Sequence, residues 1–203
     1  MTYLVTHLAL VGERLWEHLL LCATSLVIAL LIAFPLAVYV ARGTRAGPAL
    51  LGVFGAIYTI PSLALFALLV PLEGLGFWTA VTALVAYAQM ILVRNIAAAI
   101  RGVDAPSLDV ARGMGMTPRQ AFWRVTFPQA LPGMLAGVRV ATVSLIAIAT
   151  VAAFINAGGL GTFLFSGLQN DDSQLIVTGS VTSAALAIVA DVLLRRAEAL
   201  TRR

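Results

Sequence analysis

Residues Asp109–Gly133 have the sequence DVARGMGMTPRQAFWRVTFPQALPG and form the larger part of a polar block that begins at Arg94. Apolar stretches lie on both sides of this block, so it interrupts a chain that is otherwise hydrophobic. Arginines alternate in it with glycines and prolines, a pattern typical of short helices joined by tight turns. We expect such a segment to contact something outside the hydrocarbon interior of a membrane.

The composition predicts an all-α protein that crosses a membrane several times. Hydrophobic residues make up 61% of the 203 residues, charged residues make up 11%, and the mean hydropathy is +0.98. A water-soluble fold of this composition would expose large apolar patches. The high isoelectric point comes from arginines that lie between and after the apolar stretches, so it indicates membrane topology and not nucleic-acid binding.

Five apolar stretches approach the roughly 20 residues that a membrane-spanning helix needs. The N-terminal piece 3–18 is too short to span alone, and we interpret it as an interfacial helix or as an extension of the first span. The whole chain, 1–203, is interpreted as one transmembrane domain. The predicted spans are residues 19–40, 50–70, 77–93, 134–157 and 175–194.

Arginine placement predicts the orientation of these spans. Arginines follow the first, third and fifth stretches, whereas the other connections carry Glu73, or Asp171 and Asp172, and no arginine. Because positively charged loops are retained in the cytoplasm, the N-terminus is predicted outside and the C-terminus inside. The block 94–133 is then a cytoplasmic loop between spans three and four.

The first half of the polar block predicts a short helix. Pro106 and Ser107 favour a helix start near 105–108. Gly113 and Gly115 are expected to weaken and then stop that helix, since glycine is the usual residue at a helix C-terminus.

The second half predicts a turn and another helix. Thr117-Pro118-Arg119-Gln120 is typical of a capping box with proline at the first helical position. The helix is predicted to end before Pro128, and Pro132-Gly133 is predicted to turn the chain back into the membrane. From patterning alone, this unit is either a rigid element that docks on a soluble partner or an ordinary loop of amphipathic helices on the headgroups.

The segment resembles the cytoplasmic loop of ABC importer permeases, in which Glu-Ala-Ala, Gly, Ile and Leu-Pro recur at fixed spacing. The matching positions here are Asp109-Val110-Ala111, Gly115, Val125 and Phe127-Pro128, with Asp in place of Glu and Phe in place of Leu. Residues 17–42, 94–143, 157–172 and the last span are similar to the permeases that import glycine betaine, choline and related osmoprotectants. Methionine-type permeases share a plan of five spans and are the near alternative.

The resemblance implies a type I ABC importer permease fold in a bacterial inner membrane, with a coupling helix around 113–120. It implies four kinds of partner: an ATP-binding ABC subunit, a second permease chain, an extracytoplasmic substrate-binding protein and the lipid bilayer. ATP would be bound by the partner subunit, and this chain is expected to hold no cofactor or metal and no catalytic residue. The implied coupling loop comprises Asp109, Ala111, Gly113, Gly115, Met116, Thr117, Pro118 and Pro128.

Two other features are candidates for moving parts. Pro61 falls inside the second span, where it predicts a kink that serves either as a hinge or as static packing. Gly158, Gly159 and Gly161 precede a short apolar segment, 162–168, which is interpreted either as a half-buried gate at the outer mouth or as a plain connecting loop.

Polar residues inside the spans favour structural roles. Gln89 is expected to hydrogen-bond between helices, Arg139 to extend toward the inner face, and Asp191 to pair with Arg195 four residues later. His18 would need partners that the sequence does not reveal in order to bind a metal.

The sequence does not support catalysis by this chain, because it has no HExxH motif, no GxSxG motif and no lysine. The rival interpretations are a stand-alone secondary transporter or channel and, less favoured, a membrane enzyme. The first would require inverted repeats or acids inside the spans.

Overall fold

The computed structural model describes residues 3 and 6–201, which form helices and no strand. A π-helical turn, Phe122–Thr126, and a 3-10 turn, Val151–Ile155, interrupt the regular helices. The α-helices are α2 (Leu8–Ala41), α3 (Gly47–Thr59), α4 (Ser62–Glu73), α5 (Phe77–Arg101), α6 (Ala105–Gly113), α7 (Pro118–Ala121), α8 (Phe127–Ala149), α9 (Gly161–Gln169) and α10 (Ser173–Thr201).

The prediction of about five membrane-spanning helices is confirmed. Helices α2, α5 and α10 and the continuous run Pro118–Ala149 are each long and apolar enough to cross a bilayer. Helices α3 and α4 are long and apolar enough only as a pair; they are bent by 97° at a short break and make a fifth span if the pair counts as one. The predicted kink at Pro61 lies at this break, where Ile60 and Pro61 both have extended backbone.

Several helices run beyond the predicted spans. Helix α2 begins at Leu8, so the N-terminal piece extends the first span and is not a separate interfacial helix. Helix α5 continues through Arg101, about two turns past Val93, and takes up the start of the polar block. The fourth span ends earlier than predicted, because α8 gives way at Ala149 to the 3-10 turn.

The predicted helix end before Pro128 and the turn at Pro132 are wrong. The chain stays helical from Pro118 to Ala149. Proline cannot donate to the carbonyl four residues back and its ring crowds that carbonyl. The π-helical turn just before Pro128 widens the helix: the Phe127 N–H donates to the Phe122 carbonyl, five residues back.

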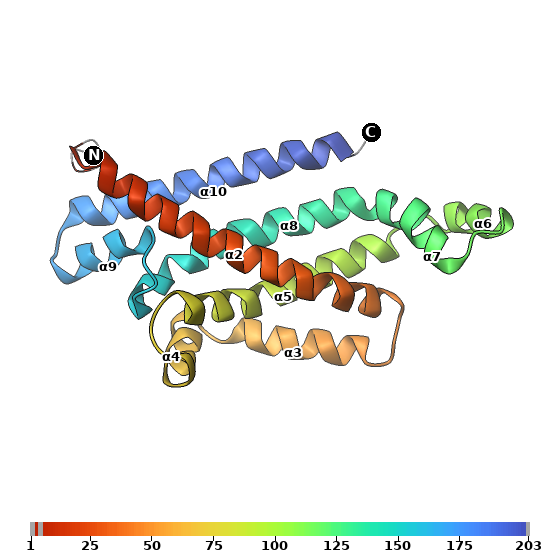
Figure 1. The fold of residues 1–203 in the computed structure, drawn as a ribbon, viewed down its shortest axis with the longest axis horizontal. Helices are drawn as coiled ribbons and strands as arrows, with labels where there is room; N and C mark the ends of the chain where they lie inside the picture. The colour runs from red at the N-terminus through yellow and green to blue at the C-terminus, as the bar shows by residue number, and fades with distance from the viewer. Residues whose placement is uncertain (1–2, 4–5, 202–203) are drawn as a thin grey trace.

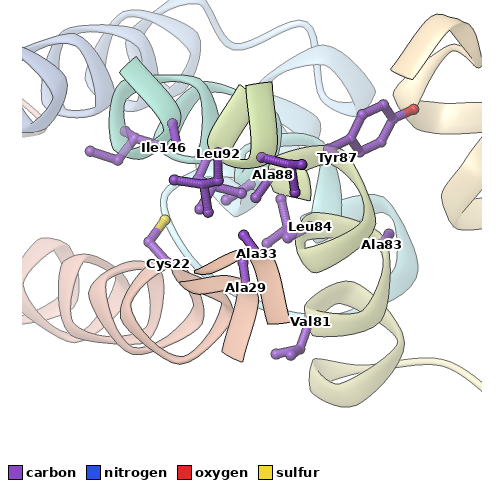
Figure 2. Packing of buried hydrophobic residues seen from close by; sticks show 14 of the residues in the cluster. Cys22, Ala29, Ala33, Val81, Ala83, Leu84, Tyr87, Ala88, Leu92 and Ile146 are labelled. Atoms are coloured by element: carbon purple, nitrogen blue, oxygen red, sulfur yellow. The ribbon is translucent and has the colours of Figure 1, made fainter. Parts of the chain in front are cut away.

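Small side chains let α2 and α5 approach closely. Ala29, Ala33 and Ala37 on α2, and Ala80 and Ala83 on α5, are all fully buried. Figure 2 shows part of this packing, with alanines of α2 facing Leu84 and Leu92 of α5. Close approach of backbones replaces the hydrophobic driving force that helices lack in lipid.

The predicted hydrogen bond of Gln89 is part of this contact: its Nε2 donates to the Ala29 carbonyl at 3.3 Å.

Helices α2, α3, α5, α8 and α10 run roughly lengthwise, whereas α4 lies across them, so most connections collect at two ends of the molecule (Figure 1). The end of α2, helices α6 and α7, and the C-terminal end of α10 lie at one end. The start of α2 and helix α9 lie at the other end. The arginine-bearing connections therefore share one end, as the alternation of charges predicts.

Candidate functional site

Helix α6 is held at both ends by local hydrogen bonds. At its start, Asp104 Oδ2 accepts from the Ser107 N–H at 3.3 Å. At its end, the Met116 N–H donates to the Ala111 carbonyl at 3.1 Å. Gly115 has a φ of +75°, the left-handed conformation that closes a Schellman motif. The predicted start near 105–108 and the stop by the glycines are confirmed.

A second set of hydrogen bonds starts α7. The Gln120 N–H donates to Thr117 Oγ1 at 3.3 Å, and Gln120 Oε1 accepts from the Thr117 N–H at 2.9 Å. Pro118 occupies the first turn, so the predicted capping box is confirmed. Because α7 runs through the π-helical turn into α8, this small helix is the end of a membrane-spanning rod.

The tip formed by α6 exposes apolar side chains. Val110 and Met114 are 62% and 71% exposed, and their spacing of four residues places them on one face of the helix. Asp109 and Arg112 form an exposed ion pair at 3.1 Å. Since this tip lies at the arginine-bearing end of the molecule, its apolar pair is suited to contact a soluble protein. Met114 is not among the loop residues predicted from the sequence, although it lies one helical turn after Val110.

The predicted loop residues do not all lie together. Those from Asp109 to Pro118 form one continuous unit of α6, turn and α7. Pro128 lies farther along, inside the rod, next to an aromatic cluster in which the ring centroids of Trp123 and Phe127 are 5.2 Å apart and those of Phe34 and Phe127 are 6.0 Å apart. Pro128 thus shapes the rod and does not belong to the exposed tip.

The break at Pro61 is stabilised by a hydrogen bond from another helix. Tyr87 on α5 donates its hydroxyl proton to the Ile60 carbonyl, which has no helical donor at the break. Freed carbonyls in a membrane must find such partners. The bend is therefore fixed by packing in this conformation.

The glycine turn after the 3-10 segment is clamped to α2 by a carboxylate. Gly158 and Gly159 have φ of +76° and +81°, and the Gly159 N–H donates to Glu17 Oε2 at 2.8 Å. Arg14 pairs with the same carboxylate at 2.8 Å. A Cβ on Gly158 would lie 2.6 Å from Glu17 Oε2, so a larger residue would displace this carboxylate, and the positive φ favours glycine in any case.

His18 makes the neighbouring clamp. Its ring is fully buried, the Leu160 N–H donates to Nδ1 at 3.3 Å, and Nε2 lies 3.1 Å from the Ile146 carbonyl. The ring therefore carries its proton on Nε2 and joins α2, α8 and the start of α9. Among residues 3 and 6–201, no cluster of three His, Cys, Asp or Glu side chains is placed to hold a metal ion.

Gly161 shows how tightly α9 is seated. A Cβ at this position would lie 1.8 Å from the Thr150 carbonyl oxygen. The segment predicted as apolar and short, 162–168, is helical within α9, and α9 packs against the 3-10 turn and α10.

An ion network ties α8 to α10. The predicted pair of Asp191 and Arg195 is confirmed at 2.7 Å. Arg139, expected to extend toward the inner face, reaches Asp191 at 2.9 Å and Glu198 at 3.5 Å, both in the C-terminal half of α10 and so toward the arginine-bearing end.

Comparison with known proteins supports this description. A family model described as "Binding-protein-dependent transport system inner membrane component" matches residues 25–203. The choline transport system permease protein OpuBB of Bacillus subtilis (strain 168) is 38% identical over 190 residues, which cover 92% of this chain and 88% of that protein. The glycine betaine/carnitine/choline transport system permease protein OpuCB of the same organism is 36% identical over 194 residues, covering 96% and 89%.

Among solved structures, one of the MetNI methionine ABC transporter in an inward-facing conformation superposes with a TM-score of 0.87. The superposition covers 97% of this chain and 98% of that chain at 21% sequence identity, so it concerns the fold.

The spans, the broken helix and the helical tip define a multi-pass membrane permease with the type I ABC importer fold. The chain belongs to the family of binding-protein-dependent transport system inner membrane components. The resemblance to the osmoprotectant permeases is confirmed by the relatives, which the chain matches over most of their length.

Proposed function

We propose that this chain is the permease subunit of an ATP-driven importer that carries a quaternary-ammonium osmoprotectant, such as choline, glycine betaine or carnitine. The observation that carries the proposal is the tip of α6 and α7, capped at both ends of α6 and at the start of α7 and bearing the outward pair Val110 and Met114. The names of the similar proteins support the substrate class. A methionine-type substrate is the second candidate, favoured by the fold neighbour alone.

The tip would be the coupling element, facing the cytoplasm, and would dock on a separate ATP-binding subunit. The arginine-bearing loops at this end support that orientation. A second permease chain would complete the pathway, and an extracytoplasmic binding protein would deliver the solute at the opposite end. ATP would be bound and hydrolysed only by the partner subunit.

Coupling follows from the continuity of the rod. The capped turn at Thr117 starts a helix that continues to Ala149, a length of about 48 Å at 1.5 Å per residue. A movement imposed on α7 is therefore passed along one continuous helix toward the far side of the membrane. Alternating access then requires only that the ATPase binds the tip differently in its two states.

The substrate proposal is tested by transport in proteoliposomes that contain this chain with its ATPase and binding protein. We expect ATP-dependent accumulation of at least one of choline, glycine betaine and carnitine, and none with a non-hydrolysable ATP analogue. Accumulation of methionine alone would favour the second candidate. Uptake that is independent of ATP would refute an ATP-driven importer.

The orientation is tested by cysteine labelling in a Cys22→Ser background. Arg119→Cys should react with a membrane-impermeant maleimide only from the cytoplasmic side, and Asp171→Cys only from the outside. The reverse pattern would invert the topology.

A further inference from the structure

A groove of about 1140 Å³ opens between the end of α2, the end of α5 and residues 108–126. Each of four elements contributes one arginine to its lining: Arg42 at the end of α2, Arg101 in α5, Arg112 in α6 and Arg119 in α7. No acidic residue lines this groove in the part of the chain that the structure describes.

Most of this positive charge is uncompensated. Arg112 pairs with Asp109, whereas Arg42, Arg101 and Arg119 form no ion pair with any described residue. Like charges gathered around one hollow raise the local concentration of anions. The groove is thus complementary to a phosphate group.

The remainder of the lining is apolar. Phe34 and Val38 come from the membrane-spanning part of α2, and Phe122 and Trp123 come from the π-helical turn. Trp123 is 50% exposed, and aromatic side chains of this kind are typical of the level where hydrocarbon meets headgroups. The groove therefore changes along its length from hydrocarbon-like to strongly cationic.

We propose that this groove binds one anionic phospholipid of the adjoining leaflet. Its phosphate lies among Arg42, Arg101 and Arg119, and an acyl chain lies along Phe34 and Trp123. Guanidinium groups bind phosphate oxygens well, and basic pockets between spanning helices are suited to anionic headgroups. A soluble phosphate would leave the apolar half uncovered, and a soluble protein would have to reach hydrocarbon depth to fill it.

The probe is phosphatidylglycerol that carries a photoactivatable diazirine in its acyl chain, with the matching phosphatidylcholine as the neutral comparison. Both are added to nanodiscs that hold the full-length chain together with the subunits that purify with it. Crosslinked peptides are mapped by mass spectrometry. We expect crosslinks in 34–39 and 122–127, with phosphatidylglycerol strongly preferred.

Replacing two of the unpaired arginines, Arg101→Gln with Arg119→Gln, should reduce that preference by about 30-fold, and each single change should reduce it by about five-fold. Arg124→Gln is the matched control, because Arg124 lies in the same segment but does not line the groove. The double change to lysine retains the charge and should retain the preference, which separates lost charge from misfolding.

Four results would overturn the proposal. The first is that the preference for phosphatidylglycerol survives removal of both arginines. The second is that Arg124→Gln reduces this preference as much as the double change does. The third is that soluble glycerol phosphate competes for the groove as effectively as phosphatidylglycerol does, which would identify a soluble anion as the ligand. The fourth is that neither lipid crosslinks in the groove, which would mean that a protein subunit covers it.

Discussion

Replacing Gly115 by alanine tests whether the turn between α6 and α7 must keep its shape for the permease to work. Gly115 has a φ of +75°, and an L-residue in that region costs about 1–2 kcal/mol. A Cβ there would meet nothing within 4 Å, so the whole cost comes from the backbone and none from a clash. We therefore expect the closed Schellman turn to become about five- to 30-fold less populated.

Gly113→Ala is the matched control, since it adds the same methyl group two residues earlier. Gly113 is the last residue of α6 and also has open space around its Cβ position. Alanine favours a helix over glycine by about 1 kcal/mol, so this change should leave the tip unchanged or more stable. Gly115→Asn should be milder than Gly115→Ala, because asparagine tolerates positive φ.

The assay measures affinity between the permease and its ATP-binding subunit, and substrate-stimulated ATP hydrolysis, in the reconstituted importer. Gly115→Ala should weaken ATPase binding by about five- to 30-fold while the chain remains inserted in the membrane. Equal effects of Gly113→Ala and Gly115→Ala would refute the argument from φ. Normal assembly and hydrolysis with Gly115→Ala would refute the assignment of this turn to coupling.

Two further changes test the packing of the membrane part. Gly161→Ala would place a Cβ 1.8 Å from the Thr150 carbonyl oxygen, so we expect a clearly lower unfolding temperature in detergent. Gly12→Ala is the control and should be neutral, because a Cβ there would meet nothing within 4 Å. Equal unfolding temperatures of the two variants would contradict the tight seating of α9. Arg139→Gln should destabilise the chain by about 1–3 kcal/mol, because the buried Glu198 loses a cationic neighbour; an unchanged denaturation midpoint would show that the network contributes nothing to stability.

The helix starts and stops of the tip could be predicted from local signals in the sequence. The cap at Thr117 and the stop at Gly115 involve hydrogen bonds between residues a few positions apart, so the sequence contains both partners side by side. Pro128 was predicted wrongly for a related reason. A proline rule considers one residue and its neighbours, whereas the π-helical turn that accommodates Pro128 depends on five residues and on packing against Phe34.

Contacts between distant residues were beyond reach from one sequence. His18 meets Ile146 across 128 positions, and Gly159 meets Glu17 across 142. The sequence around each of these residues is ordinary for its helix or turn. A polar side chain in the first part of a helix does not indicate which distant residue it will contact. The partners of Arg139 were likewise not predicted, because its two carboxylates lie about 50 residues or more along the chain.

These long-range contacts limit how α8 can move when the tip is pushed. Arg139 holds its inner half to α10, and the Ile146 carbonyl holds its outer half to His18 on α2. Breaking a buried charged contact on one side leaves the other charge unpaired and is costly. It is therefore easier for α2, α8 and α10 to move together than for α8 to slide between them. In the proposed importer, the relative motion of alternating access is then expected at surfaces that such contacts do not cross, above all the face toward a second permease chain.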